Sequence, residues 1–224
     1  MIIKQIENVE KEKLTKFKQE YYNLYPDYLQ EELDEKLLLG FTNNNDIINQ
    51  IYCYLNLIEE NINPYLEFYN ILNNNFDLKN MKILEVGCGF IPILSKIFSD
   101  NNISIDIIDP LVTFKTLNAG KVLNEKFSID TNIDNYDLII GYNPCGATEN
   151  MIRKSITESK DFCIFLCGCC FLPADYTDRT PDRWHKYLYD LATELSNGKY
   201  EIKFIYFDKK YNLEYPIIIG KKAL

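Results

Sequence analysis

The chain reads Ile83-Leu84-Glu85-Val86-Gly87-Cys88-Gly89-Phe90-Ile91-Pro92 at the point where its hydrophobic pattern changes. The apolar run predicts a buried strand, the two glycines predict a tight turn, and Pro92 suits the first turn of a helix. Glycine also lets a ligand approach the backbone closely, and the N-terminus of a helix offers free N–H groups. The stretch therefore predicts a loop that binds a nucleotide-type ligand, with an ordinary strand-to-helix turn as the structural alternative.

Strands and helices alternate downstream of this loop. The expected strands are Lys82–Val86, Ile103–Ile108, a less regular Lys126–Ile129, Tyr136–Ile140 and Phe162–Leu166. The expected helices are Pro92–Phe98, Leu111–Asn118, Thr148–Ser159 and Pro181–Leu195. This alternation predicts an α/β fold with a mainly parallel sheet. The last two apolar runs, Tyr200–Phe207 and Tyr215–Ile219, are joined only by a short polar turn, so they must pair antiparallel.

The first 78 residues have a different pattern. Apolar side chains recur there at helical spacing in three segments, the third of which starts at Pro64. We therefore expect an N-terminal helical cap over residues 1–78 and an α/β domain over residues 79–224. Four tyrosines in the first segment suit either a lid over the ligand pocket or plain helix packing; they are Tyr21, Tyr22, Tyr25 and Tyr28.

Length, charge and cysteine content limit the possible functions. The 224 residues suit one domain with an extension, and their net charge of −9 opposes binding to bulk nucleic acid. Neither a membrane-spanning run nor a signal-peptide pattern is present, so we expect a cytoplasmic protein. An odd number of cysteines, seven, suits reduced thiols. Four of them lie between Cys163 and Cys170, where a buried strand explains them better than a metal site, so we expect no metal.

The residues around the glycines favour one class of ligand. A dinucleotide loop requires a third glycine where this chain has Pro92. Asp109 follows the second strand, 20 residues beyond Gly89, where a carboxylate can accept both ribose hydroxyls of an adenosine cofactor. Glu85, two residues before the first glycine, resembles the acidic residue in the S-adenosylmethionine (SAM) loop of class I methyltransferases.

The end of the fourth strand is expected to face the reacting group, because ligands of open parallel sheets lie beyond the carboxyl ends of the strands. Tyr142, Asn143, Pro144 and Cys145 occupy that position, and Asn143-Pro144 faintly resembles the signature of enzymes that methylate amino groups. The segments "GYNPCGATENMIR", "FLCGCCFLP" and "RTPDRWHKYLYDL" resemble a branch of class I methyltransferases with an HxCGxxT-like fourth-strand motif and a PCC-like fifth-strand motif. The similarity spans about Lys82 to Leu195, with Asn143 in place of the histidine and Gly168 in place of the proline.

The resemblance implies a fold, a cofactor and site residues. The fold is a three-layer sandwich around a seven-stranded, mostly parallel sheet that ends in an antiparallel hairpin. The cofactor is SAM, with S-adenosylhomocysteine (SAH) as product. The implied cofactor-binding residues are Glu85, Gly87, Cys88, Gly89, Asp109, Pro110, Asp130 and Asn143, and the implied acceptor-side residues are Asn143, Tyr142 and Cys145.

The sequence therefore predicts a SAM-dependent methyltransferase, most simply one that acts on a small molecule. Some members of the resembling branch act on RNA, so an RNA- or protein-modifying enzyme is one alternative, and a non-catalytic nucleoside-binding scaffold is another. His185 suits a general base or, like Trp184 and Arg183, a residue of a solvated or packed first helical turn. A homo-oligomer is compatible with the sequence.

Overall fold

The computed structural model describes residues 63–89, 92–110, 112, 120–168, 172–173, 180–211 and 213–223. The helices are α5 (Pro64–Asn75), α6 (Ile93–Asp100), α7 (Thr148–Thr157) and α8 (Pro181–Ser196). The strands are β1 (Ile83–Val86), β2 (Asp106–Ile108), β3 (Val122–Leu123), β4 (Leu138–Tyr142), β5 (Asp161–Phe165), β6 (Tyr200–Tyr206) and β7 (Pro216–Lys222).

These strands form one seven-stranded sheet in the order β3-β2-β1-β4-β5-β7-β6. The first five strands pair in parallel, whereas β7 runs antiparallel to both β5 and β6. All residues of β1 and β5 are buried, as expected of parallel strands that are covered on both faces. The predicted α/β sandwich with a C-terminal antiparallel hairpin is therefore confirmed.

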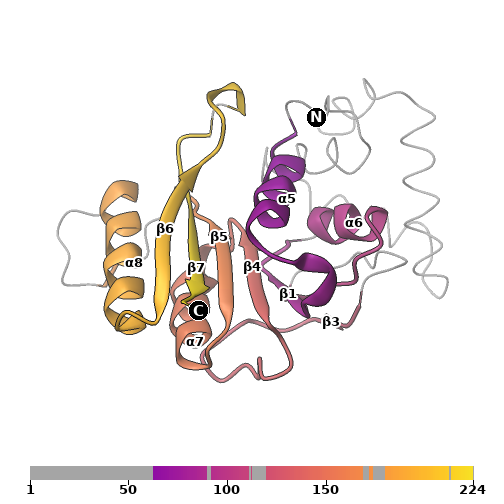
Figure 1. The fold of residues 1–224 in the computed structure, drawn as a ribbon, viewed down its shortest axis with the longest axis horizontal. Coiled ribbons are helices and arrows are strands. Elements are labelled where there is room, and N and C mark those ends of the chain that lie inside the picture. Colours follow the sequence, from indigo (N-terminus) through magenta and orange to yellow (C-terminus); the bar gives the residue numbers. More distant parts are fainter. Residues whose placement is uncertain are drawn as a thin grey trace.

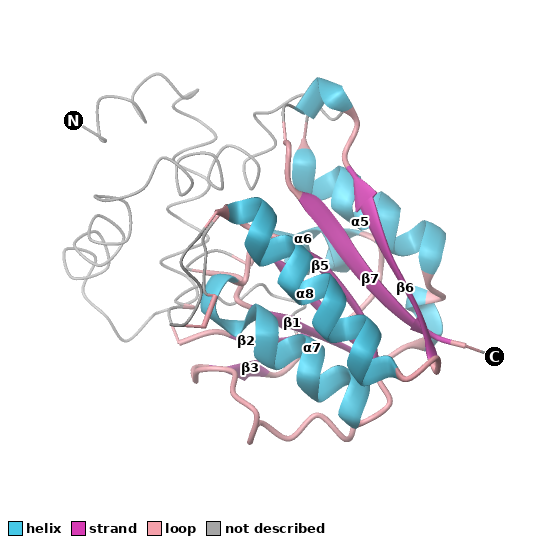
Figure 2. Ribbon diagram, turned by 90° about the vertical axis from the view of Figure 1, so that its left-hand side faces the viewer, coloured by secondary structure: helices cyan, strands magenta, loops and turns pink. Residues whose placement is uncertain are grey.

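Helices cover both faces of the sheet. On one face, α5 and α6 pack against alternate strand residues such as Ile83, Ile140 and Phe165 (Figure 1). On the other face, α7 and α8 pack against the intervening residues, among them Leu84 and Ile164 (Figure 2). The alternation of side chains along each strand thus divides the core into two hydrophobic layers.

Helix α5 belongs to the first of these layers. Asn63 caps its N-terminus, because the side-chain oxygen accepts hydrogen bonds from the backbone N–H groups of Tyr65 and Leu66. Phe68 and Leu72 have no exposed surface and lie in the same cluster as the sheet residues. The two helices predicted upstream, and with them the tyrosine lid, lie outside the described residues, so the domain boundary after residue 78 stays a prediction.

Several strand predictions were wrong in their bounds. The strand predicted over Ile103–Ile108 is Asp106–Ile108, and the one predicted over Tyr136–Ile140 is Leu138–Tyr142. The third strand is Val122–Leu123 and not Lys126–Ile129, and its two residues pair with β2. The last strand begins at Pro216 and continues to Lys222, because all of its residues pair with β6. The helix predicted over Leu111–Asn118 falls almost wholly outside the described residues. Within the part of the chain that the structure describes, no helix has the length and apolar character needed to span a membrane.

Candidate functional site

The carboxyl ends of β1, β2 and β4 meet at one edge of the sheet. Glu85 of β1 lies opposite Ile107 on one side and Ile140 on the other, so the loops after these three strands are neighbours. The N–H of Gly87 donates a hydrogen bond of 3.1 Å to the carbonyl oxygen of Ile108 and continues the β1–β2 pairing into the loop. The sheet therefore brings together the glycine loop, Asp109 and the segment that follows Tyr142.

The glycine loop needs glycine for two separate reasons. Gly87 and Gly89 have φ angles of +75° and +70°, in the left-handed region that glycine adopts without steric cost. A Cβ atom at Gly87 would also lie 2.8 Å from the Cα of Pro144, so the loop after β4 packs directly onto this backbone. The contact with Pro144 is one that sequence spacing does not reveal.

Asp109 holds the loop from the neighbouring strand. Its Oδ2 accepts a 2.8 Å hydrogen bond from the N–H of Gly89, and its own N–H donates to the carbonyl oxygen of Leu123. The residue is only 7% exposed. A charged hydrogen bond of this kind fixes the position of Gly89 relative to the tip of β2.

Glu85 lies beneath the loop and is almost completely buried at 2% exposure. Its carboxylate accepts a hydrogen bond from the backbone N–H of Ser95 in the first turn of α6, where Pro92 provides no side-chain cap. Its Oε2 has no hydrogen-bond partner among the described residues. Burial, and secondarily the negative charge of Asp109, raise the pKa of Glu85 to about 8, although the Ser95 bond opposes the shift.

Cys88 lies between these two carboxylates and is also buried. Burial raises the pKa of its thiol, and the charges of Glu85 and Asp109 raise it further. The thiol therefore stays protonated, and Sγ lies 3.4 Å from the carbonyl oxygen of Gly89 as a weak donor. These properties suit a packing residue of the loop and not a nucleophile, because the thiolate is the reactive form.

The turn after β4 is strained. Asn143 and Cys145 have φ angles of +55° and +47°, which non-glycine residues adopt at a cost, and they flank the buried Pro144. Two hydrogen bonds hold this backbone: the N–H of Asn143 donates to the carbonyl oxygen of Phe165, and Thr148 Oγ1 donates to that of Cys145. The turn presents Asn143 as an exposed residue at the edge where β4 and β5 end.

Tyr142 belongs to an aromatic cluster on the α5 side of the sheet. Its ring stacks on that of Tyr65, with centroids 4.1 Å apart and an interplanar angle of 24°. Phe68 and Phe165 contact it on other sides. Sequence reasoning missed Tyr65; its only signal is its position directly after the helix-initiating Pro64.

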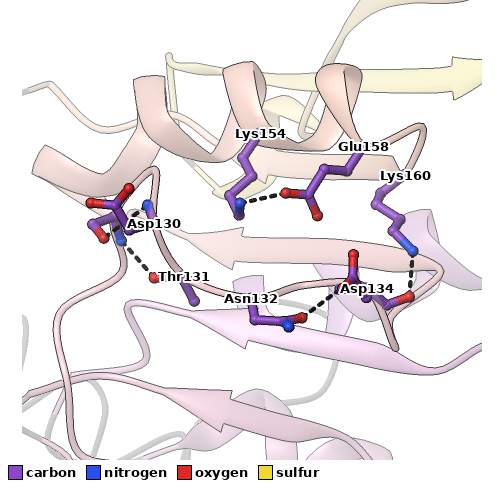
Figure 3. A network of polar contacts seen from close by, with 8 residues as sticks. Asp130, Thr131, Asn132, Asp134, Lys154, Glu158 and Lys160 are labelled. Atoms are coloured by element: carbon purple, nitrogen blue, oxygen red, sulfur yellow. Dashed lines mark hydrogen bonds and ion pairs between the residues drawn. The ribbon is translucent and has the colours of Figure 1, made fainter.

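Asp130 and Pro110 are both exposed. Asp130 lies in a small turn in which Ser128 and Thr131 hydrogen bond to each other. Figure 3 shows Asp130 beside the first half of α7, and Asp134 further along the chain beside Lys160. Phe127 anchors this turn, since it is buried in the same cluster as Val86 and Ile108. The turn therefore lies next to the ends of β1 and β2, while a contact between Asp130 and a ligand stays a prediction.

The seven-stranded, mostly parallel sheet and its antiparallel C-terminal hairpin are the architecture that the sequence resemblance implied. The chain has the fold of class I methyltransferases. Neither a protein-family model nor a curated protein sequence matches it.

Solved structures resemble it only distantly. Magnesium protoporphyrin IX methyltransferase from Synechocystis PCC 6803, with bound SAM, is 12% identical over 84% of this chain and 97% of that one, with a TM-score of 0.48. A SAM-dependent methyltransferase from Aquifex aeolicus is 14% identical over 69% and 88%, with a TM-score of 0.42. A mutant of MtNAS in complex with SAM is 10% identical over 92% and 76%, with a TM-score of 0.44. At this similarity, the function of the chain has to be inferred from its own residues.

The structure places three residues in the first turns of α8. Trp184 is 1% exposed and packs on the sheet in the α7–α8 layer, and Arg183 is exposed. His185 is buried at 5% exposure, and its Nε2 lies 3.0 Å from the carbonyl oxygen of Cys167. Burial lowers the pKa of His185. The Nε2 of His185 is therefore engaged by the backbone of the loop after β5.

The cysteine-rich segment is partly described. Cys163 and Cys167 are buried and are not in disulfides, and burial raises the pKa of Cys163 far above its usual value. Cys169 and Cys170 lie outside the described residues. Among the residues that are described, no group of three or more His, Cys, Asp or Glu side chains is placed to hold a metal ion.

Proposed function

We propose that this chain binds SAM at the edge formed by β1, β2 and β4 and transfers its methyl group to a small-molecule acceptor, leaving SAH. One observation carries the proposal: the hydrogen bond from Gly89 N–H to Asp109 joins a glycine loop to a carboxylate at the tip of the next strand. This is the arrangement that an adenosine cofactor requires, with the loop against its chain and the carboxylate beside its ribose.

The charges of this edge fit SAM in particular. SAM carries a sulfonium and an ammonium group, and the carboxylate of Asp109 lies buried under the loop beside the carboxyl group of Glu85, whose pKa burial raises. The unpartnered Oε2 of Glu85 is a buried acceptor that would gain a partner from a ligand or an adjusted loop. A pyrophosphate-containing cofactor such as NAD would instead bring negative charge close to the Asp109 carboxylate, which favours SAM over a dinucleotide.

In this proposal the loop residues Gly87, Cys88 and Gly89 hold the cofactor, with Asp109 and Pro110 at the ribose and Asp130 beside the adenine. SAM supplies an activated methyl electrophile, so the protein's main task is to align a nucleophile for in-line displacement. Asn143, Tyr142 and Cys145 orient the acceptor from the turn after β4. The backbone strain at Asn143 and Cys145 supports a functional role, because such strain concentrates where a site must be held in one geometry.

A small-molecule acceptor fits this chain better than RNA. The net charge of −9 opposes a phosphate backbone, and the edge residues described above contribute carboxylates and not cations. A protein acceptor and a non-catalytic SAM-binding scaffold are the remaining alternatives. They share the cofactor site with the first proposal and differ in what happens at Asn143.

Calorimetric titration of the full chain with SAM, SAH and NAD tests the cofactor. We expect saturable binding of SAM and SAH and no binding of NAD. Protein that is folded by circular dichroism but binds neither SAM nor SAH would overturn the proposal. With tritium-labelled SAM, label from a mixed cell extract should then enter the small-molecule fraction; label in RNA or protein would identify one of the alternatives.

Asp109 provides a sharper test through two variants. Asp109→Asn keeps an oxygen that accepts the Gly89 N–H bond but removes the charge, whereas Asp109→Ala removes both. We expect SAM affinity to fall about tenfold or more in Asp109→Asn and further in Asp109→Ala, because a lost charged hydrogen bond is worth about 1.5–3 kcal/mol. Undiminished affinity in folded Asp109→Asn would remove the carboxylate from the ribose site.

A further inference from the structure

A second cavity of about 400 Å³ opens between α8 and the β6–β7 hairpin. Asp182, His185 and Tyr189 line it from α8, Phe204 and Tyr206 from β6, and Glu214 from the segment before β7. Pro216 also lines the cavity, and its carbonyl oxygen accepts a hydrogen bond from the N–H of Leu166, directly after β5. The cavity therefore lies at the same edge of the sheet as the candidate cofactor site. Two further strands, β5 and β7, separate β4 from β6, so this cavity is distinct from the glycine loop.

Aromatic rings form the apolar part of its wall. Tyr189 and Phe204 pack together with ring centroids 5.0 Å apart. Tyr206 is 59% exposed, which is unusual for so large a side chain at the end of a strand. Ring faces of this kind attract cations that are positioned over them.

The charges of the wall are predominantly negative. Lys186 and Asp190, which also line the cavity, form an ion pair of 2.7 Å with each other along α8 and offset one another. The other two charged residues of the wall are Asp182 and Glu214, and neither forms an ion pair within the described residues. The cavity therefore combines aromatic faces with two carboxylates that form no ion pair within the part of the chain that the structure describes.

His185 adds a hydrogen-bond acceptor. The ring is 5% exposed, and because a carbonyl oxygen only accepts, Nε2 must donate to Cys167. In the neutral ring Nδ1 is then an acceptor, and it has no hydrogen-bond partner among the described residues although His185 lines the cavity. Burial, which lowers the pKa of His185, keeps the ring neutral and Nδ1 available.

We propose that this cavity binds an organic ammonium ion with an apolar body. The rings of Tyr189, Phe204 and Tyr206 contact the body and the cation, Asp182 and Glu214 neutralise the charge, and His185 Nδ1 accepts a hydrogen bond from the ammonium N–H. The volume of about 400 Å³ suits a small amine. The proposal stands whether or not the chain binds SAM.

His185 makes the test unusually direct, because it is the only histidine of the chain. The full chain, labelled with ¹⁵N in histidine, is titrated with 2-phenylethylammonium and, in parallel, with the neutral 2-phenylethanol. We expect saturable binding of the ammonium with a shift of the Nδ1 signal, and affinity for the alcohol lower by about tenfold, the range of a desolvated cation–π contact. Equal affinity for the two probes, or binding without any change at Nδ1, would overturn the proposal.

Four variants separate the cavity from the general attraction of an acidic protein for cations. We expect Asp182→Asn, Glu214→Gln and Tyr206→Ala each to weaken ammonium binding by about threefold to tenfold. Glu201→Gln is the matched control: Glu201 is an exposed acid at the opposite end of β6, opposite Lys221 in the register. It should bind like the wild type. Equal weakening in Glu201→Gln, or none in the three cavity variants, would show that the probe responds only to net charge.

Discussion

At the scale of single residues, Gly87 carries two constraints that can be separated by experiment. Gly198 has nearly the same φ angle, +76°, but an added Cβ would meet nothing within 4 Å, whereas at Gly87 it would meet Pro144 at 2.8 Å. We expect Gly198→Ala to lower the free energy of unfolding by about 1 kcal/mol through backbone strain, and Gly87→Ala to lower it by about 1–3 kcal/mol more through overpacking. Urea denaturation of both variants measures the difference. Equal losses would show that the Pro144 contact yields at no cost.

Glu85 makes stability depend on pH. Because its folded-state pKa of about 8 lies above the ordinary value of 4.5, folding takes up a proton between these limits. Its contribution to stability is fully present below pH 4.5 and is lost as the pH rises through 8, by about 1 kcal/mol per pH unit within the window.

Glu85→Gln removes this dependence, since an amide does not titrate. Between pH 5.5 and 7.5, we expect the free energy of unfolding of the wild type to fall by about 2 kcal/mol more than that of Glu85→Gln. Urea denaturation at several pH values gives both curves. Parallel curves would show that Glu85 titrates normally in the folded protein.

At the scale of elements, the turn after β4 combines backbone strain with the proposed acceptor site. Asn143 at φ +55° and Asn197 at φ +45°, the residue after α8, share the left-handed conformation, so glycine should stabilise the fold by about 0.5–1 kcal/mol at either position. We expect methyl transfer to fall at least tenfold in Asn143→Gly, because the acceptor loses an orienting side chain, and to be unchanged in Asn197→Gly. Thermal unfolding and turnover measure the two effects; full activity in Asn143→Gly would remove its side chain from the acceptor site.

Patterns within the sequence predict most of these elements because the elements depend on local periodicity. The strand ending at Val86, the antiparallel hairpin and the helices from Pro64 and Pro181 all follow from apolar spacing and helix-start signals. The third strand was placed wrongly because Val122–Leu123 is too short to produce a pattern and is defined only by its pairing with β2.

The candidate site also divides into features that the sequence predicts and contacts that only the fold defines. The sequence indicates that Gly87, Gly89 and Asp109 follow neighbouring strands, and the structure joins Gly89 to Asp109 by a hydrogen bond. The packing of Pro144 onto Gly87 and of Tyr65 onto Tyr142 joins residues far apart in the chain. No spacing rule encodes such pairs, because they depend on which elements the fold places side by side.

At the scale of the whole molecule, net charge leads to a prediction about the acceptor. A chain at −9 repels phosphates, so we expect no saturable binding of a 20-nucleotide single-stranded RNA at 0.15 M salt, with or without SAM. Fluorescence anisotropy of labelled RNA measures this. Saturable binding with a steep dependence on salt would reveal a basic surface and favour the RNA-modifying alternative.

The strand order also constrains how the protein is made. Strand β7 lies between β5 and β6, although β6 precedes it in the chain. During synthesis, β6 therefore emerges from the ribosome with no neighbour to pair with, and the edge of β5 stays open until Pro216–Lys222 has been translated. Unpaired edges of this kind invite pairing between chains. The nascent protein is consequently most prone to aggregate in the interval between the synthesis of its fifth strand and its last.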